Sequence, residues 1–110
     1  QLKEFPINTI KILNKKIVFS GGGYFRIIPY FIINKFMNKS DYVMFYLHPR
    51  DIDFNQPKIQ SLSLKRKFKS YVGLQNAERK FNILLQNHHF NDIKNTSNNI
   101  NWNNVPVINL

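Results

Sequence analysis

The first half of the chain changes its hydrophobic spacing at residue 41, and each spacing predicts a different element. Three apolar residues recur every four positions, as one face of a helix requires: Ile28, Ile32 and Phe36. Pro29 fits only the first turn of such a helix, so we expect it to start near Ile28 and to end within residues 38–40. Residues 42–47 then form an unbroken apolar run, which predicts a strand covered on both faces.

A second amphipathic helix is predicted later in the chain, where five apolar residues form one stripe between polar neighbours. The stripe consists of Leu74, Ala77, Phe81, Leu84 and Leu85. Near the N-terminus, residues 4–7 and 10–13 read as extended, and residues 16–19 complete a hairpin with a turn at residues 14–15. The glycines at 21–23 then imply unusual backbone angles or the close approach of another group.

This order of strand, glycine loop, helix, buried strand, loop and helix is typical of an α/β protein. Reactive groups in such folds lie at the carboxyl ends of strands, on the loops that follow. His48 lies at that position, and Pro49 ends the strand there because proline removes the next backbone donor. An imidazole can donate or accept a proton near neutral pH. A structural histidine, hydrogen-bonded at the strand end, is the alternative interpretation.

Charge adds a second functional hypothesis. The formal net charge is +10 over 110 residues, and its densest point is residues 65–69 (KRKFK). A solvated basic face is favoured over nucleic-acid binding because no recognised nucleic-acid motif accompanies the charge. An anionic polysaccharide or a membrane surface would also suit it. The absence of cysteine excludes disulfides, and the longest apolar runs are far shorter than the roughly 20 residues of a membrane span.

Several segments together resemble one known family. They are residues 4–6 (EFP), 19–26 (FSGGGYFR), 29–30 (PY), 45–49 (FYLHP), 51–53 (DID), 56–57 (QP) and 71–74 (YVGL). In this order they are similar to the C-terminal half of the NodB-like polysaccharide deacetylases of exopolysaccharide and exosortase loci, including a C-terminal extension of uncharacterised role. The resemblance implies the C-terminal part of a distorted (β/α) barrel, incomplete in this chain, since such a barrel needs about 200 residues or more.

The resemblance also implies a mechanism for the complete enzyme. A divalent metal such as zinc is held by upstream residues, an upstream aspartate acts as general base, and the late histidine protonates the departing sugar amine. That histidine matches His48. The substrate, an N-acetylated polysaccharide, is expected to contact Tyr24, Arg26, Tyr46 and Asp51. Two residues depart from the family pattern: Arg50 replaces a common tryptophan, and Asp51 replaces a glutamate and could change a contact to the substrate or to Arg26.

The remaining candidates carry weaker signals. His88 and His89 are adjacent at a predicted helix end without a third metal ligand at a suitable spacing, so no metal site is assigned to this chain. Asp53 reads as a turn former. We expect the deacetylase portion to cover residues 1–90 and residues 91–110 to form a polar, asparagine-rich tail with a short strand near its end. A start within a domain is expected, and a bacterial cytoplasm is the favoured location.

The leading interpretation is therefore the C-terminal fragment of a metal-dependent deacetylase, inactive as an isolated chain. The alternative is a small basic module that binds polysaccharide or nucleic acid without catalysis. The basic run at residues 65–69 suggests this alternative.

Overall fold

The N-terminal hairpin opens the computed structural model, which describes residues 2–108. Strand β1 (Thr9–Ile12) pairs antiparallel with β2 (Lys15–Val18), and Thr9 lies opposite Val18. The hairpin is confirmed, but its turn lies at Leu13 and Asn14, one residue earlier than expected. Their φ angles are 46° and 65°, as two-residue hairpin turns require, and asparagine tolerates this conformation well.

The helical stretch that follows the glycines consists of two helices. Helix α1 (Gly22–Ile27) begins within the glycine run, and α2 (Tyr30–Lys39) begins after Pro29. The helix expected from near Ile28 is confirmed as α2, which starts two residues later because Ile28 and Pro29 both adopt extended backbone angles, whereas α1 was not expected. A residue that precedes proline is disfavoured in the helical region, so the break falls there. The predicted end within residues 38–40 is confirmed.

Residues 42–47 are extended, but they do not form the strand covered on both faces that the apolar run predicted. They make one isolated parallel bridge, between Gly21 and Tyr46. The Tyr46 N–H donates to Ser20 O (3.0 Å), and Gly22 N–H donates to Tyr46 O (3.2 Å). The Asn8 side chain takes the place of a further strand, since it donates to Tyr42 O and accepts from Met44 N–H.

All these hydrogen bonds use residues 42, 44 and 46, which point to one side of the segment. The backbone groups of Val43, Phe45 and Leu47 point to the other side, where no strand lies among residues 2–108. Within the described part of the chain, residues 42–47 are therefore hydrogen-bonded along one edge only.

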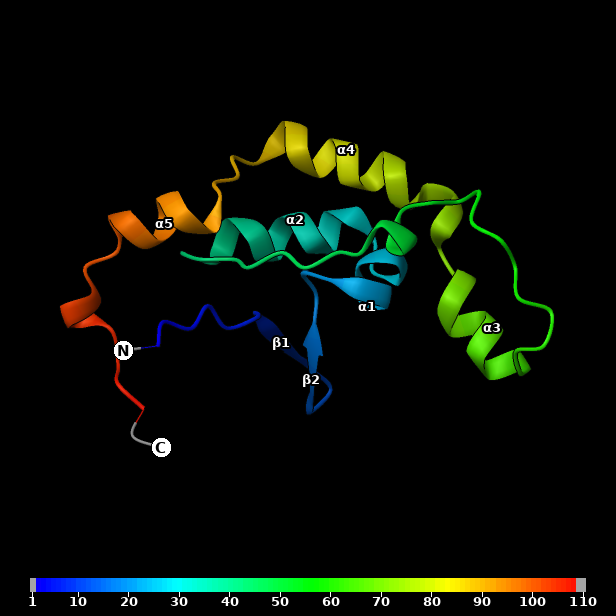
Figure 1. The fold of residues 1–110 in the computed structure, drawn as a ribbon, viewed down its shortest axis with the longest axis horizontal. Coiled ribbons are helices and arrows are strands. Elements are labelled where there is room, and N and C mark those ends of the chain that lie inside the picture. Colours follow the sequence, from blue (N-terminus) through cyan, green and yellow to red (C-terminus); the bar gives the residue numbers. More distant parts are fainter. Residues whose placement is uncertain (1, 109–110) are drawn as a thin grey trace.

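The second half of the chain is helical. It contains a 3₁₀ turn η1 (Pro49–Asp51), helix α3 (Leu64–Tyr71), a second 3₁₀ turn η2 (Leu74–Asn76), α4 (Ala77–Asn87), α5 (Ile93–Asn99) and a last 3₁₀ turn η3 (Trp102–Asn104). The predicted second helix is confirmed as η2 and α4, with Leu74, Ala77 and Leu84 buried. Figure 1 shows α4 lying along α2, with α3 and α5 at opposite ends of the molecule.

The asparagine-rich tail is more ordered than the sequence suggested. Asp92 caps α5 because its side chain accepts from the Asn95 N–H at 2.7 Å. Within residues 105–108 no strand forms, and residues 109–110, where the predicted strand continues, lie outside the described residues. Helix α5 within this tail was not predicted from the sequence.

Five buried side chains form the centre of the core: Phe19, Phe25, Ile28, Ile33 and Leu84. Many other large apolar side chains are exposed. The Cα radius of gyration is 16.3 Å, against roughly 13 Å for a compact domain of about 100 residues. The chain is thus a small, open α/β domain. Its described residues form no barrel, and its one sheet has two strands. No described helix has the length and apolar character of a membrane span.

Lys80 ties α4 to the end of α1. Its ammonium donates to three carbonyl oxygens, those of Phe25 (2.9 Å), Arg26 (2.9 Å) and Ile28 (2.8 Å). These carbonyls lie at the C-terminal end of α1, where backbone carbonyls have no hydrogen-bond donors within the helix. Lys80 therefore acts as a remote cap of α1.

Replacing Lys80 with Met is expected to lower the free energy of unfolding by about 2 kcal/mol, because the three half-buried carbonyls lose their donor. Burial also lowers the pKa of Lys80 below 10.5. Between the folded pKa and 10.5 the unfolded chain binds more protons, so the contribution of Lys80 to stability rises with pH across that interval. Urea unfolding at several alkaline pH values checks both effects. Arg79→Met, at an exposed position of the same helix, should change stability little.

Candidate functional site

The candidate site forms where two segments distant in sequence meet at the Gly21–Tyr46 bridge. A Cβ atom on Gly21 would collide with the carbonyl oxygen of Tyr46, so only glycine permits this approach. Gly22 has a φ of 54°, in the left-handed region. The prediction that the glycine run serves unusual backbone angles or a close approach is confirmed for both residues. Residues 45–51 are thereby fixed next to the start of α1.

His48 is exposed and directly follows this bridged segment. Its Nε2 lies 2.9 Å from the hydroxyl of Tyr46, and the two rings meet edge to face with centroids 4.8 Å apart. Residues two apart in an extended segment project to the same side, which explains the pairing. The ring is therefore oriented by a neighbour while it stays open to solvent.

Asp51 holds the backbone of His48 on both sides. Its carboxylate Oδ2 accepts from the His48 N–H at 3.1 Å, and its own N–H donates to His48 O at 2.8 Å. This is the capping arrangement of η1, in which a short carboxylate reaches back to the residue before the turn. Asp51 is 6% exposed. Asp51 is thus buried in the domain, while the His48 ring that it supports is exposed.

Arg26 connects this carboxylate to α3. Its Nη1 and Nη2 donate to the carbonyls of Ser70 (2.6 Å) and Lys69 (2.8 Å), and its Nε lies 3.8 Å from Asp51 Oδ1. Burial lowers the pKa of Arg26, Asp51 opposes that shift, and Arg50 adds to it. An arginine nevertheless stays charged in proteins. Arg26 therefore compensates the buried Asp51 and also caps the C-terminus of α3.

A tight turn at Gly73 completes this arrangement. Gly73 has a φ of 73°, and a Cβ atom there would come within 2.7 Å of Arg26 O. The chain thus passes from α3 to α4 directly over the backbone of Arg26.

The sequence-predicted site residues fall into two groups. Tyr24, Tyr46 and His48 are exposed, and the two tyrosines are each about half accessible. Arg26 and Asp51 are buried and face each other, as the sequence interpretation considered for this pair. Their contact with substrate stays a prediction. Lys80 and Ser70, which hold the same region together, carried no local sequence signal because their partners lie more than 40 residues away.

The loop after η1 is ordered by its own polar side chains. Asp53 accepts from the Asn55 N–H at 2.9 Å, which confirms its interpretation as a turn former. Gln56 donates to the carbonyls of Arg50 and Asp53. Arg50 itself is exposed next to His48.

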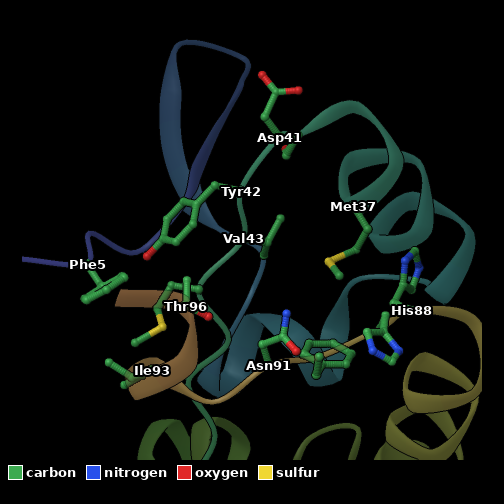
Figure 2. A pocket seen from close by; sticks show the side chains of 13 residues that line it. Phe5, Met37, Asp41, Tyr42, Val43, His88, Asn91, Ile93 and Thr96 are labelled. Atoms are coloured by element: carbon green, nitrogen blue, oxygen red, sulfur yellow. The ribbon is translucent and has the colours of Figure 1, made fainter. Parts of the chain in front are cut away.

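Another pocket lies away from this site. It has a volume of about 310 Å³ and is formed by the end of α2, residues 40–44, residues 88–91 and α5. Figure 2 shows Phe5 and Ile93 at one end of it and His88 at the other. His88 bonds Asn34 at 2.8 Å, and His89 is exposed. Within residues 2–108, no group of three histidine, aspartate, glutamate or cysteine side chains could hold a metal ion.

A second pocket of about 290 Å³ adjoins the candidate site. It is lined by apolar side chains only: Phe45, Leu47, Phe81, Leu85 and Phe90. Leu47 is the residue before His48, and the side chains of Phe45 and Leu47 project from the same face of the extended segment. The pocket is therefore bounded by one face of the extended segment, two residues of α4 and Phe90.

Comparison with family models gives a match to a known family. The family described as Domain of unknown function (DUF3473) covers residues 1–98. The chain belongs to the DUF3473 family. This family is associated with polysaccharide deacetylase-related proteins. No curated protein and no solved structure matches the chain. The match extends beyond residue 90, so the DUF3473 domain includes most of α5.

Proposed function

We propose that this DUF3473 chain is the C-terminal part of a metal-dependent polysaccharide deacetylase of the NodB-like type, acting on N-acetyl sugars in exopolysaccharide biosynthesis. The observation that carries the proposal is the placement of His48. An exposed imidazole ends an extended segment, its ring is oriented by Tyr46, and its backbone is held by Asp51. The association of the family with deacetylase-related proteins supports the same reaction.

In this reaction His48 is the general acid. After water adds to the carbonyl carbon of the N-acetyl group, the carbon–nitrogen bond must break, and an amine leaves poorly without a proton. The protonated imidazole donates its proton to that nitrogen as the bond breaks, which releases acetate and the free amino sugar. An exposed ring suits this role, since the sugar nitrogen has to approach within hydrogen-bonding distance.

The divalent metal implied by the family does not fit the residues of this chain. No cluster of ligand side chains exists in the part that the structure describes, and His88 is engaged with Asn34. We therefore place the metal ligands and the general base on polypeptide upstream of Gln1. The chemistry assigned to this chain is limited to proton donation and to shaping the substrate groove.

The open edge of residues 43–47 supports an incomplete barrel. A parallel strand is normally paired on both edges and covered on both faces. Here one edge bonds Ser20, Gly22 and Asn8, while on the other edge Val43, Phe45 and Leu47 have no backbone partner among residues 2–108. We infer that upstream strands complete the sheet on this side.

Substrate contacts are proposed for Tyr24 and Tyr46, whose exposed rings offer faces for a sugar. Arg26 and Asp51 are assigned an indirect role, since both are buried and hold the loop that carries His48. We therefore regard these two as positioning residues.

Acetate release tests the proposal. The chain joined to its upstream polypeptide, supplied with zinc, is expected to release acetate from an N-acetylglucosamine oligomer, and the isolated chain is expected to release none. Failure of the joined protein on N-acetylated oligosaccharides with zinc, cobalt or manganese contradicts the assignment.

The charge of α3 favours a second candidate, a small basic module without catalysis. Four of its eight residues are Lys or Arg and none is acidic. This candidate requires the isolated chain to bind a soluble polyanion with a steep salt dependence.

A further inference from the structure

Helix α3 presents apolar side chains to solvent. None of its residues is buried, and Leu64 and Phe68 are 85% and 63% exposed. Residues four apart share one helix face, so the two side chains form a stripe that Tyr71 continues. Figure 1 shows α3 at one end of the molecule, apart from the pair formed by α2 and α4.

The preceding loop extends this apolar face. The Tyr71 hydroxyl accepts from the Ile59 N–H at 2.8 Å, which ties the loop to the same side of α3. Ile59 is 54% exposed. We call Ile59, Leu64, Phe68 and Tyr71 the α3 face. Arg26 anchors the C-terminal end of α3, because it donates to the last carbonyls of this helix from the body of the domain.

Cations flank the α3 face, and the sequence around it contains no acidic residue. At 100° per residue, Lys65 and Lys67 lie on either side of the stripe, and Lys69 and Arg66 lie behind it. Lys58 adds a further charge in the loop. Between Asp53 and Glu78 the sequence contains no acidic residue. The surface is therefore complementary to an anionic partner that also accepts apolar side chains.

We propose that the α3 face docks on an anionic lipid surface, with Leu64 and Phe68 entering the interface and the flanking cations lying among lipid phosphates. A basic helix with an aliphatic and an aromatic residue on one face is the type that lies in a bilayer interface. A soluble polyanion would engage the cations but would leave Leu64 and Phe68 in water. The docking is independent of the deacetylase reaction and would hold the protein beside a membrane.

Vesicle flotation with the full chain tests the proposal. Binding is expected to vesicles that contain phosphatidylglycerol, weakly or not at all to pure phosphatidylcholine, and less as salt rises. Each cation near an anionic surface contributes about fivefold in affinity, so Lys65→Gln, Arg66→Gln and Lys69→Gln together should weaken binding about 10²-fold. Leu64→Ser with Phe68→Ser, which keeps every charge, should weaken it at least about tenfold.

Matched controls come from other exposed positions. Lys11→Gln, Lys15→Gln and Lys16→Gln remove the same charge from the hairpin, and Leu13→Ser with Phe31→Ser removes two side chains that are 93% and 71% exposed. Both controls should retain most of the vesicle affinity. Circular dichroism of all variants should match the parent, because every substituted residue is exposed.

Three results would overturn the proposal. One is vesicle binding that persists without Leu64 and Phe68. The second is an equal loss in the hairpin controls, which would reduce the effect to net charge. The third is equal affinity for dextran sulfate that the apolar substitutions do not change, which would assign α3 to a soluble polyanion.

Discussion

Replacing His48 with Gln, in the chain joined to its upstream polypeptide, is expected to lower kcat for deacetylation by about 10²- to 10⁴-fold. This range is the usual contribution of a positioned general acid. Glutamine keeps the approximate size and polarity of the side chain but cannot donate a proton to a departing amine. The loss should fall mainly on kcat, because the proton is transferred in the transition state and contributes little to ground-state binding.

His89→Gln is the matched control. His89 is also exposed, but it lines the separate pocket between α2 and α5 and should leave kcat unchanged. Tyr46→Phe removes the hydroxyl that orients the His48 ring at 2.9 Å and should give an intermediate loss, about tenfold. Acetate release at saturating oligosaccharide measures all three variants. An unchanged rate for His48→Gln would remove His48 from the reaction.

Replacing Arg26 with Met is expected to lower the free energy of unfolding by about 3–5 kcal/mol. The substitution leaves Asp51 as an uncompensated buried carboxylate and frees two carbonyls at the end of α3. Domains of this size are stable by only about 5–15 kcal/mol in total, and this core is thin. The variant should therefore be largely unfolded at moderate urea concentrations.

Urea unfolding followed by circular dichroism measures this effect. Arg50→Met, at an exposed arginine of the same region, should change stability by less than about 0.5 kcal/mol. Adding Asp51→Leu to Arg26→Met should restore part of the stability, because the unpaired carboxylate is then removed. A loss below about 1 kcal/mol for Arg26→Met would show that the pair does not hold the loop of His48.

Elements with a strong hydrophobic period could be predicted from the sequence. The hairpin and the combined η2–α4 segment follow directly from apolar spacing. Helix α1 was missed because its first residues are glycines, which are poor helix formers and were read as a loop. Residues 42–47 were predicted as a covered strand because all six are apolar or aromatic. This composition suits a central strand, but the described chain provides hydrogen-bond partners for one edge of the segment only.

The missed helices α3 and α5 have a different cause. Charge dominates α3, and only Leu64, Phe68 and Tyr71 mark its period. Asparagine dominates α5, whose clearest signal is the capping residue Asp92. For the site, the position of His48 at the end of an extended run was predictable. The bonds of Arg26 to residues 69–70 were not, because they join parts of the chain more than 40 residues apart.

The pH dependence of kcat/KM tests most directly whether His48 supplies the proton. In the joined protein, wild-type acetate release is expected to follow a bell-shaped profile, whose alkaline limb reports loss of the general acid. In His48→Gln that alkaline limb should disappear, while the acidic limb of the upstream base persists. An alkaline limb retained unchanged in the variant would contradict the assignment, because another group would then be donating the proton.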